Sequence, residues 1–340
     1  MIENTLTQTE DEKIAALEEQ FQQAEHAPDI DPVHLVNLMN ELGWVLRKSD
    51  PERTRSMALR AHDLATTQSY HRGTAYSLRN WGISAFLLET YDVSLDKLLA
   101  AKTLFEQLDE ATELTDTGGT DAGITEVGLI DTHLYTSAVY GALGDYSNAL
   151  SFGFQTLDLA KRVDYIWGLV QSLHKIHIIY CILNEYREGI KYGEESLVFA
   201  DMSGDLNDKA NVLNSLAVSY KMLAEYAPAL EYSQQSLRLI RQASYPDLRL
   251  EANILDTLGT IYTCLDDETQ AISYLNECID ISHKLNYTQT EIEAQMNIGK
   301  IYQTSNPVLA IDYFQNILAQ PQTPQTKRYQ AQTNQYLFEI

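Results

Sequence analysis

The sequence is poor in cysteine, in basic residues and in long apolar runs, and each shortage excludes a class of protein. Three cysteines, Cys181, Cys264 and Cys278, are too few and too scattered for a disulfide framework or a CxxC-type metal site. Lys and Arg number 24 against 48 Asp and Glu, and this net charge of −24 disfavours nucleic-acid and anionic-membrane binding. No apolar run is long enough to span a membrane, and the acidic N-terminus does not resemble a signal peptide. We therefore expect a cytoplasmic protein.

Motifs for catalysis are missing as well. The sequence contains no GxSxG, P-loop, HExxH or kinase motif, and the nearest string to GGDEF is GGTD at 118–121. Without a nucleophile and base in a recognisable arrangement, we expect no enzymatic activity and no cofactor. His174, His177 and Cys181 have the i, i+3, i+7 spacing that could bring them to one metal ion. Their places in the repeat described below favour packing instead, so no metal site is predicted.

The acidic residues gather in two zones. Residues 1–31 carry a net charge of −8 and residues 103–160 a net charge of −10, while the rest of the chain is close to charge balance. The remaining surface is therefore an ordinary mixed one rather than a uniform polyanion.

A short pattern of residues recurs along the chain. In one copy Leu258 and Gly259 are followed by Tyr262 and then by Ala271. Other copies place the same Tyr at 140, 180, 220 and 302, so that the intervals are 40, 40, 42 and 40 residues, and two divergent copies precede them around Gly43 and Gly82. Apolar residues at i, i+3, i+4 and i+7 predict one helix in each copy and a second after a short break. Small residues such as Gly259 let the two helices approach closely.

The pattern resembles the tetratricopeptide repeat, which reads aromatic, two residues, Leu-Gly, two residues, Tyr, then a small residue. Its period of about 40 is similar to that of the Rap, MalT and kinesin-light-chain arrays. The segment LRKSDPERTRSMALRAHDLA at 46–65 resembles the opening repeat of arrays in the N-terminal sensory region of bacterial signalling proteins such as diguanylate cyclases and histidine kinases. The resemblance implies an all-α fold, a right-handed superhelical solenoid of about seven antiparallel helix pairs.

The repeats predict the organisation of the chain. Residues 1–11 are expected to be a disordered acidic N-terminus, 12–31 a capping helix and turn, and 32–320 the repeat array. Residues 321–340 are expected to begin an eighth repeat or to cap the array, and we favour a chain that continues beyond them. Few apolar residues occur in DEATELTDTGGTDAGITEVG at 109–128, which predicts an irregular, mobile loop insertion. Its acids lack the alternation of an EF-hand, which favours a solvated loop over a calcium site.

Binding is expected on the concave face, which the first helix of each repeat lines. Positions three and six residues before the small residue should point into it, and many of them are Asn or Gln. A carboxamide has both a donor and an acceptor and can therefore bond the backbone of an extended peptide of any sequence. The alternative, that Asn merely tolerates a wet groove, stays open. The candidate partner-binding residues are Asn37, Asn40, Arg79, Gln171, His174, Asn211, Asn214, Asn253 and Asp256.

These features predict a non-enzymatic protein- or peptide-binding scaffold, the sensory or regulatory interaction region of a bacterial signalling protein. The groove lacks the paired Lys and Arg of carboxylate-clamp repeats, so the partner is expected to be neutral or basic rather than acidic. Two alternatives remain open. One is a self-association module that dimerises and controls a C-terminal output domain, and the other is a receptor for a small molecule or a peptide pheromone.

Overall fold

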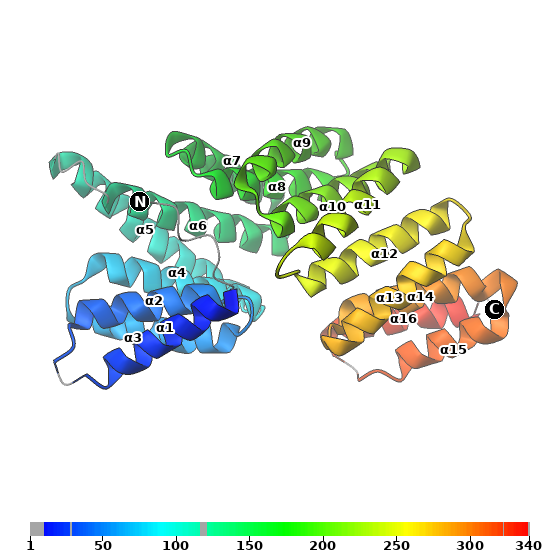
Figure 1. Cartoon of the computed structure of the whole chain (residues 1–340), viewed down its shortest axis with the longest axis horizontal. Helices are drawn as coiled ribbons and strands as arrows, with labels where there is room; N and C mark the ends of the chain where they lie inside the picture. The colour runs from blue at the N-terminus through cyan, green and yellow to red at the C-terminus, as the bar shows by residue number, and fades with distance from the viewer. Residues whose placement is uncertain (1–9, 28, 116–120, 322, 339–340) are drawn as a thin grey trace. The chain divides into compact units, whose positions relative to one another are not determined.

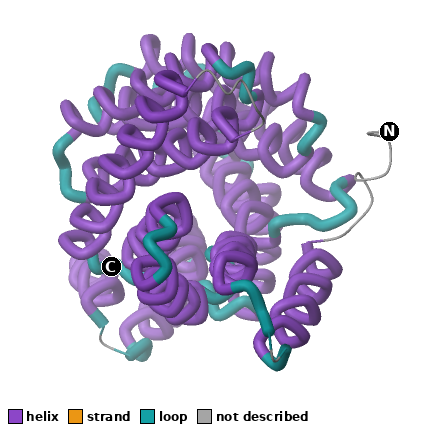
Figure 2. The backbone as a smooth tube through the Cα atoms, turned by 90° about the vertical axis from the view of Figure 1, so that its left-hand side faces the viewer, coloured by secondary structure: helices purple, strands orange, loops and turns teal. Residues whose placement is uncertain are grey.

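A computed structural model describes residues 10–27, 29–115, 121–321 and 323–338. Within these residues it contains helices and loops and no strand (Figure 2). The chain divides into two compact units, Met1–Ile179 and Tyr180–Ile340, and the boundary lies inside one helix. This boundary lies within the repeat array predicted at 32–320.

The first unit contains a single helix followed by helix pairs (Figure 1). From α1 to α7 each helix contacts the next one along the chain, and α2, α4 and α6 also lie side by side. The helices are α1 (Glu10–Glu25), α2 (Pro32–Leu46), α3 (Pro51–Thr67), α4 (His71–Leu87), α5 (Tyr91–Thr115), α6 (Asp121–Ala142), α7 (Tyr146–Arg162) and α8 (Ile166–Ile182), the last of which crosses into the second unit.

The second unit repeats this arrangement. Helices α10, α12, α14 and α16 lie side by side, and each contacts its chain neighbours. The helices are α9 (Tyr186–Ser203), α10 (Leu206–Met222), α11 (Tyr226–Gln242), α12 (Leu248–Cys264), α13 (Glu268–Lys284), α14 (Thr288–Ser305), α15 (Pro307–Leu318) and α16 (Pro324–Phe338). In chain order α2 to α15 form seven pairs in the described residues, as the repeat pattern predicts.

The turns that follow Tyr140, Tyr180, Tyr220 and Tyr262 share one backbone geometry. In these four, the N–H five residues after the Tyr donates to the carbonyl of that Tyr, as from Glu225 to Tyr220 at 2.9 Å and from Asp267 to Tyr262 at 3.0 Å. The preceding residue adopts a left-handed conformation, with φ of 79° at Gly144 and 58° at Ala224. Such a 6→1 bond satisfies a carbonyl that the helix end leaves without a partner, and it stops the first helix.

The recurring small residues and tyrosines pack as predicted. A Cβ added to Gly259 would lie 2.5 Å from Leu275 Cγ on the partner helix, so only glycine permits this approach. The anchor tyrosine stacks on a second tyrosine 12 residues later, with the rings of Tyr220 and Tyr232 5.5 Å apart. The same stack occurs in the neighbouring repeats, at Tyr180–Tyr192 and Tyr262–Tyr274.

The predicted loop at 109–128 is wrong for the residues that the structure describes. Helix α5 continues to Thr115 and α6 begins at Asp121, so helix replaces loop on both sides, and 116–120 lie outside the described residues. The acidic composition was misleading because Glu, Ala and Leu favour helix wherever they can continue an existing one. At the N-terminus α1 begins at Glu10, two residues before the predicted cap, and residues 1–9 lie outside the described part. At the other end α16 occupies most of 321–340.

Candidate binding surfaces

The structure buries most of the predicted groove residues of the first unit. Asn40 is 7% exposed, Arg79 5% and His174 4%, while Asn37 is exposed and Gln171 is half-buried. Asn40 Nδ2 donates to the carbonyl of Gly73 on α4 at 3.1 Å, and Asn37 Oδ1 accepts from the Tyr70 hydroxyl at 3.0 Å. These side chains therefore join helices of the array.

Arg79 is the centre of a buried polar cluster. Its guanidinium lies 2.8 Å from the carboxylate of Asp131 on α6, which is 2% exposed, and it donates twice to Asn80 Oδ1. It also lies over the rings of Trp44, at 4.1 Å from the centroid, and of Tyr76, at 4.7 Å. Burial raises the pKa of Asp131 to about 6, although the charge of Arg79 acts in the opposite direction. The contact between Arg79 and Asp131 joins α4 to α6.

The cluster extends from α2 to α8. The Arg47 guanidinium stacks on Trp44 at 3.8 Å, and its Nε donates to the Tyr135 hydroxyl on α6 at 3.4 Å. The Trp44 ring meets the Trp167 ring of α8 edge to face at 6.5 Å. The inner helices of the first unit are therefore joined by their own aromatic and cationic side chains. Sequence reasoning identified Arg79 but not these contacts, because the residues that make them lie far apart in the chain.

Two candidate residues of the second unit, both on α10, keep unused hydrogen-bonding capacity. Asn211 is half-buried, and its side chain has no hydrogen bond within the described part of the chain. Asn214 is 8% exposed, and its buried Oδ1 has no hydrogen-bond partner there either. An unsatisfied buried carbonyl costs about 1–3 kcal/mol, so an N–H donor that reached Asn214 Oδ1 would remove this cost.

The other two candidates, on α12, are bonded to α14. Asn253 Oδ1 accepts from the Thr290 hydroxyl at 3.2 Å, and Asp256 Oδ1 accepts from Asn297 Nδ2 at 3.1 Å. Burial raises the pKa of Asp256 to about 6, with Lys221 opposing and Glu293 adding to the shift. The inner helices of this unit thus carry a connected polar row.

Lys221, Thr260 and Tyr329 also belong to this row, and sequence reasoning did not identify them. Lys221 Nζ donates to the Thr260 hydroxyl at 2.8 Å between α10 and α12, and the Tyr329 hydroxyl of α16 donates to Glu293 on α14. The signal that could have found them is helical spacing, because Thr260 follows Asp256 by one turn on the same helix. The row therefore offers carboxylates, carboxamides and hydroxyls along one side of the unit.

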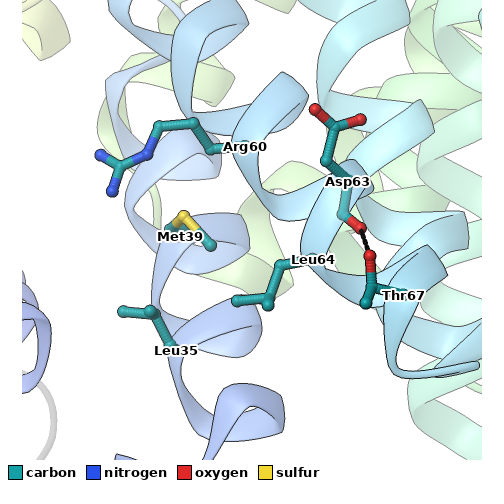
Figure 3. Close-up of a pocket in the computed structure, with 6 residues that line it drawn as sticks. All are labelled: Leu35, Met39, Arg60, Asp63, Leu64 and Thr67. Atoms are coloured by element: carbon teal, nitrogen blue, oxygen red, sulfur yellow. Dashed lines mark hydrogen bonds between the residues drawn. The ribbon is translucent and has the colours of Figure 1, made fainter.

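Two pockets lie away from the predicted residues. Figure 3 shows one of about 410 Å³ between α2 and α3, with apolar Leu35, Met39 and Leu64 below the charged side chains of Arg60 and Asp63. A second, of about 200 Å³, is formed by residues of α14, the segment after α15 and α16. Its lining residues are Thr288, Gln289, Ile292, Gln320, Pro321, Thr323, Thr326 and Tyr329.

The histidines of α8 are buried. His174 and His177 are 4% and 0% exposed, and burial lowers the pKa of His177 to about 4 and that of His174 well below its ordinary value. Cys181 Sγ lies 3.0 Å from the hydroxyl of Ser219. Among the described residues no group of three His, Cys, Asp or Glu is placed to hold a metal ion. Over the same residues, no helix combines the length and apolar character that crossing a bilayer requires.

Comparison with known proteins gives the fold. Residues 210–244, which cover α10 and α11, match the tetratricopeptide repeat model. The apo quorum sensor NprR from B. thuringiensis is 15% identical, with a TM-score of 0.66 over 96% of this chain and 83% of that one. Apo RapI is 13% identical, with a TM-score of 0.63 over 90% of this chain and 99% of that one. NprR in complex with its cognate peptide NprX is 14% identical, with a TM-score of 0.59 over 96% and 94%.

No curated protein matches the sequence. At these sequence identities the solved structures indicate the fold alone. That fold agrees with the repeat pattern, with the paired helices and with the match of residues 210–244 to the repeat model. The chain is an all-helical array of tetratricopeptide-type helix pairs, with the fold of RapI and NprR.

Proposed function

We propose that the chain is a non-enzymatic scaffold that binds an extended peptide or protein segment along the inner helices of its second unit. The observation that carries the proposal is the vacant capacity on α10, where the side chain of Asn211 is half-buried and without a hydrogen bond and Asn214 buries an acceptor without a partner. Both carboxamides can bond a peptide group as donor and acceptor, and Asn214 Oδ1, which is buried in the free protein, would accept from a peptide N–H once its side chain turns toward the peptide.

Two further observations support this site. The repeat that carries both asparagines is the one that matches the tetratricopeptide repeat model. NprR, which has the same fold, was solved in complex with a peptide. We extend the proposal to a sensory or regulatory role in a bacterial signalling protein, in which binding at this row is the input.

The charge of the row favours a neutral or basic partner. Asp256 and Glu293 lie on α12 and α14 of the same unit, and the chain as a whole has a net charge of −24. Complementary charge increases the association rate and disfavours acidic competitors. Peptides selected from a random library on the purified chain should therefore be depleted in Asp and Glu.

The test is the affinity of such a selected peptide for matched variants. Asn211→Ala and Asn214→Ala should each weaken binding by about fivefold or more, which corresponds to about 1 kcal/mol per lost hydrogen bond. Asn276→Ala is the control, because Asn276 is an exposed residue on the outer helix α13. Unchanged affinity in both α10 variants would exclude recognition by this row.

The free protein provides a second readout. Because Asn214 buries an unsatisfied oxygen, Asn214→Ala should leave the free energy of unfolding unchanged or raise it, although the change also creates a small cavity. If Asn214 served only to pack the helices, Asn214→Ala would lower the free energy of unfolding and leave the affinity for the peptide unchanged.

A further inference from the structure

A pocket lies at the α16 end of the polar row of the second unit. It has a volume of about 200 Å³ and is formed by residues of α14, of the segment after α15 and of α16. Two of its lining residues, Gln289 and Tyr329, bond the same atom, Glu293 Oε1. Gln289 Nε2 donates to it at 3.2 Å, and the Tyr329 hydroxyl donates to it as well. The Glu293 carboxylate is therefore one hydrogen bond away from the pocket wall.

Hydrogen bonds within the chain hold this wall in place. Gln330, which is 7% exposed, donates from Nε2 to the carbonyl of Leu318 at 3.3 Å and to that of Gln320 at 2.9 Å. The Thr326 hydroxyl donates to the carbonyl of Pro321 at 2.7 Å. These bonds fix Gln320 and Pro321, which line the pocket, against α16. A pocket that is formed before binding needs less ordering when a ligand enters it.

The lining combines apolar surface with neutral polar groups. Pro321 and the ring of Tyr329 supply accessible apolar surface, and Ile292, which also lines the pocket, is fully buried. Three threonines and two glutamines supply hydroxyls and carboxamides. None of the described residues that line the pocket is charged, so Glu293 is the charged group to which its wall is bonded.

Glu293 has no cationic partner among the described residues. It is half-buried, and its second oxygen, Oε2, accepts no hydrogen bond there. Arg328 precedes Tyr329 on α16 but is exposed and forms no ion pair with Glu293. A cation that reached Oε2 would form a charge-assisted hydrogen bond, which is about twice as strong as a neutral one.

We propose that this pocket holds a cationic side chain of the bound peptide, a lysine or an arginine, with its charged end at Glu293. A cavity of about 150 Å³ holds a molecule the size of benzene, so about 200 Å³ is enough for one long side chain. Lysine and arginine place an apolar stem behind a charged end, which matches the apolar surface of Pro321 and Tyr329 beside a carboxylate. The inference rests on the proposed function for the peptide that carries this side chain.

The first experiment uses single amino-acid derivatives, so that binding at the pocket is measured without a peptide along α10. The probes are Nα-acetyl-lysine amide and Nα-acetyl-norleucine amide, which has an apolar four-carbon side chain without the ammonium. The readout is the NMR signal of the Ile292 methyl group, identified by its absence in Ile292→Val, because Ile292 lines the pocket. The lysine derivative should shift this signal in a saturable manner, and the norleucine derivative should bind at least tenfold more weakly.

The second experiment compares two substitutions on α14. Glu293→Gln keeps an acceptor for Gln289 and Tyr329 but loses the charge, so it should weaken binding of the lysine derivative by about tenfold or more. Glu291→Gln is the matched control, because Glu291 accepts from Gln295 and not from a residue that lines the pocket. It should bind as the wild type does.

A third variant tests the pocket itself. Thr288 is an exposed lining residue at the start of α14, so Thr288→Phe should fill the pocket without disturbing the core and should abolish binding of the lysine derivative. Unchanged binding in this variant would place the lysine derivative elsewhere and overturn the proposal.

The remaining outcomes separate this pocket from the peptide site on α10. The proposal is overturned if the lysine derivative does not shift the Ile292 signal, if the norleucine derivative binds as tightly, or if Glu293→Gln binds as tightly as Glu291→Gln. Failure of the Asn211 and Asn214 variants to weaken peptide binding, with the lysine derivative still bound at Glu293, would contradict the proposed function and leave the cationic pocket in place.

Discussion

Replacing Arg79 with methionine should strongly destabilise the first unit. The change removes the ion pair with Asp131 and leaves a carboxylate that is 2% exposed. One oxygen of this carboxylate, Oδ1, already lacks a partner, and the change leaves both oxygens without one. Removing one member of a buried pair typically costs about 3–5 kcal/mol.

The structure also predicts the cost of removing both charges. Methionine keeps the packing of the Arg79 stem but loses the stacking on Trp44 and Tyr76, which is worth about 1–2 kcal/mol. With Asp131→Leu added, no unpaired charge remains buried, so the double variant should lose only about that amount. The double variant should therefore be more stable than Arg79→Met alone.

Urea unfolding followed by tryptophan fluorescence measures this difference. The chain has three tryptophans, at 44, 81 and 167, and all lie in the first unit, so the signal reports that unit. The cost of Arg79→Met should shrink as the pH falls, because burial raises the pKa of Asp131 and protonation then removes the unpaired charge. Equal stability of the single and double variants, or a cost for Arg79→Met below about 1 kcal/mol, would show that an unpaired Asp131 carboxylate does not destabilise the first unit.

Three other predictions concern the second unit. Ala224→Gly should raise the free energy of unfolding by about 1 kcal/mol in thermal or urea unfolding, because Ala224 has a φ of 58°, whereas Ala227→Gly in α11 should lower it. Asp256→Asn should become more stable relative to wild type as the pH rises from about 4 to 7. Burial raises the pKa of Asp256 from 3.8 to about 6, so ionisation above about pH 4 favours the unfolded wild-type chain, whereas asparagine does not ionise. An equal pH dependence of the free energy of unfolding in both proteins would contradict this. Thiol reagents followed by mass spectrometry should label exposed Cys264 quickly and Cys278 only on unfolding, because Cys278 is buried and its pKa is raised to about 12.

Most of the fold could be predicted from local sequence patterns. The interval between Tyr180, Tyr220 and Tyr262 is set by the length of one helix pair, and the close contact at Gly259 needs a glycine in the sequence itself. Such features are visible because each repeat contacts mainly its neighbours. The acidic segment at 109–128 was misjudged because composition alone does not show whether a helix continues.

The candidate site was less predictable, for a physical reason. Helical spacing placed Arg79 and Asn40 on the inner side of their helices, but it could not show that other side chains cover them. Whether other side chains cover them depends on the angle between successive helix pairs of the first unit. In the structure this angle brings Trp44 into contact with Trp167, which is 123 residues further along the chain. In the second unit the spacing identified Asn211 and Asn214, whose unused hydrogen-bonding capacity only the structure reveals.

The proposed function depends on a partner segment that lies along α10 of the second unit. Site-specific photo-cross-linking tests it most directly, with a photoreactive residue placed at position 211 on α10 or at position 276 on α13 and a library-selected peptide added. We expect the peptide to be cross-linked from position 211 and not from position 276. Cross-linking from position 276, with none from position 211, would contradict it.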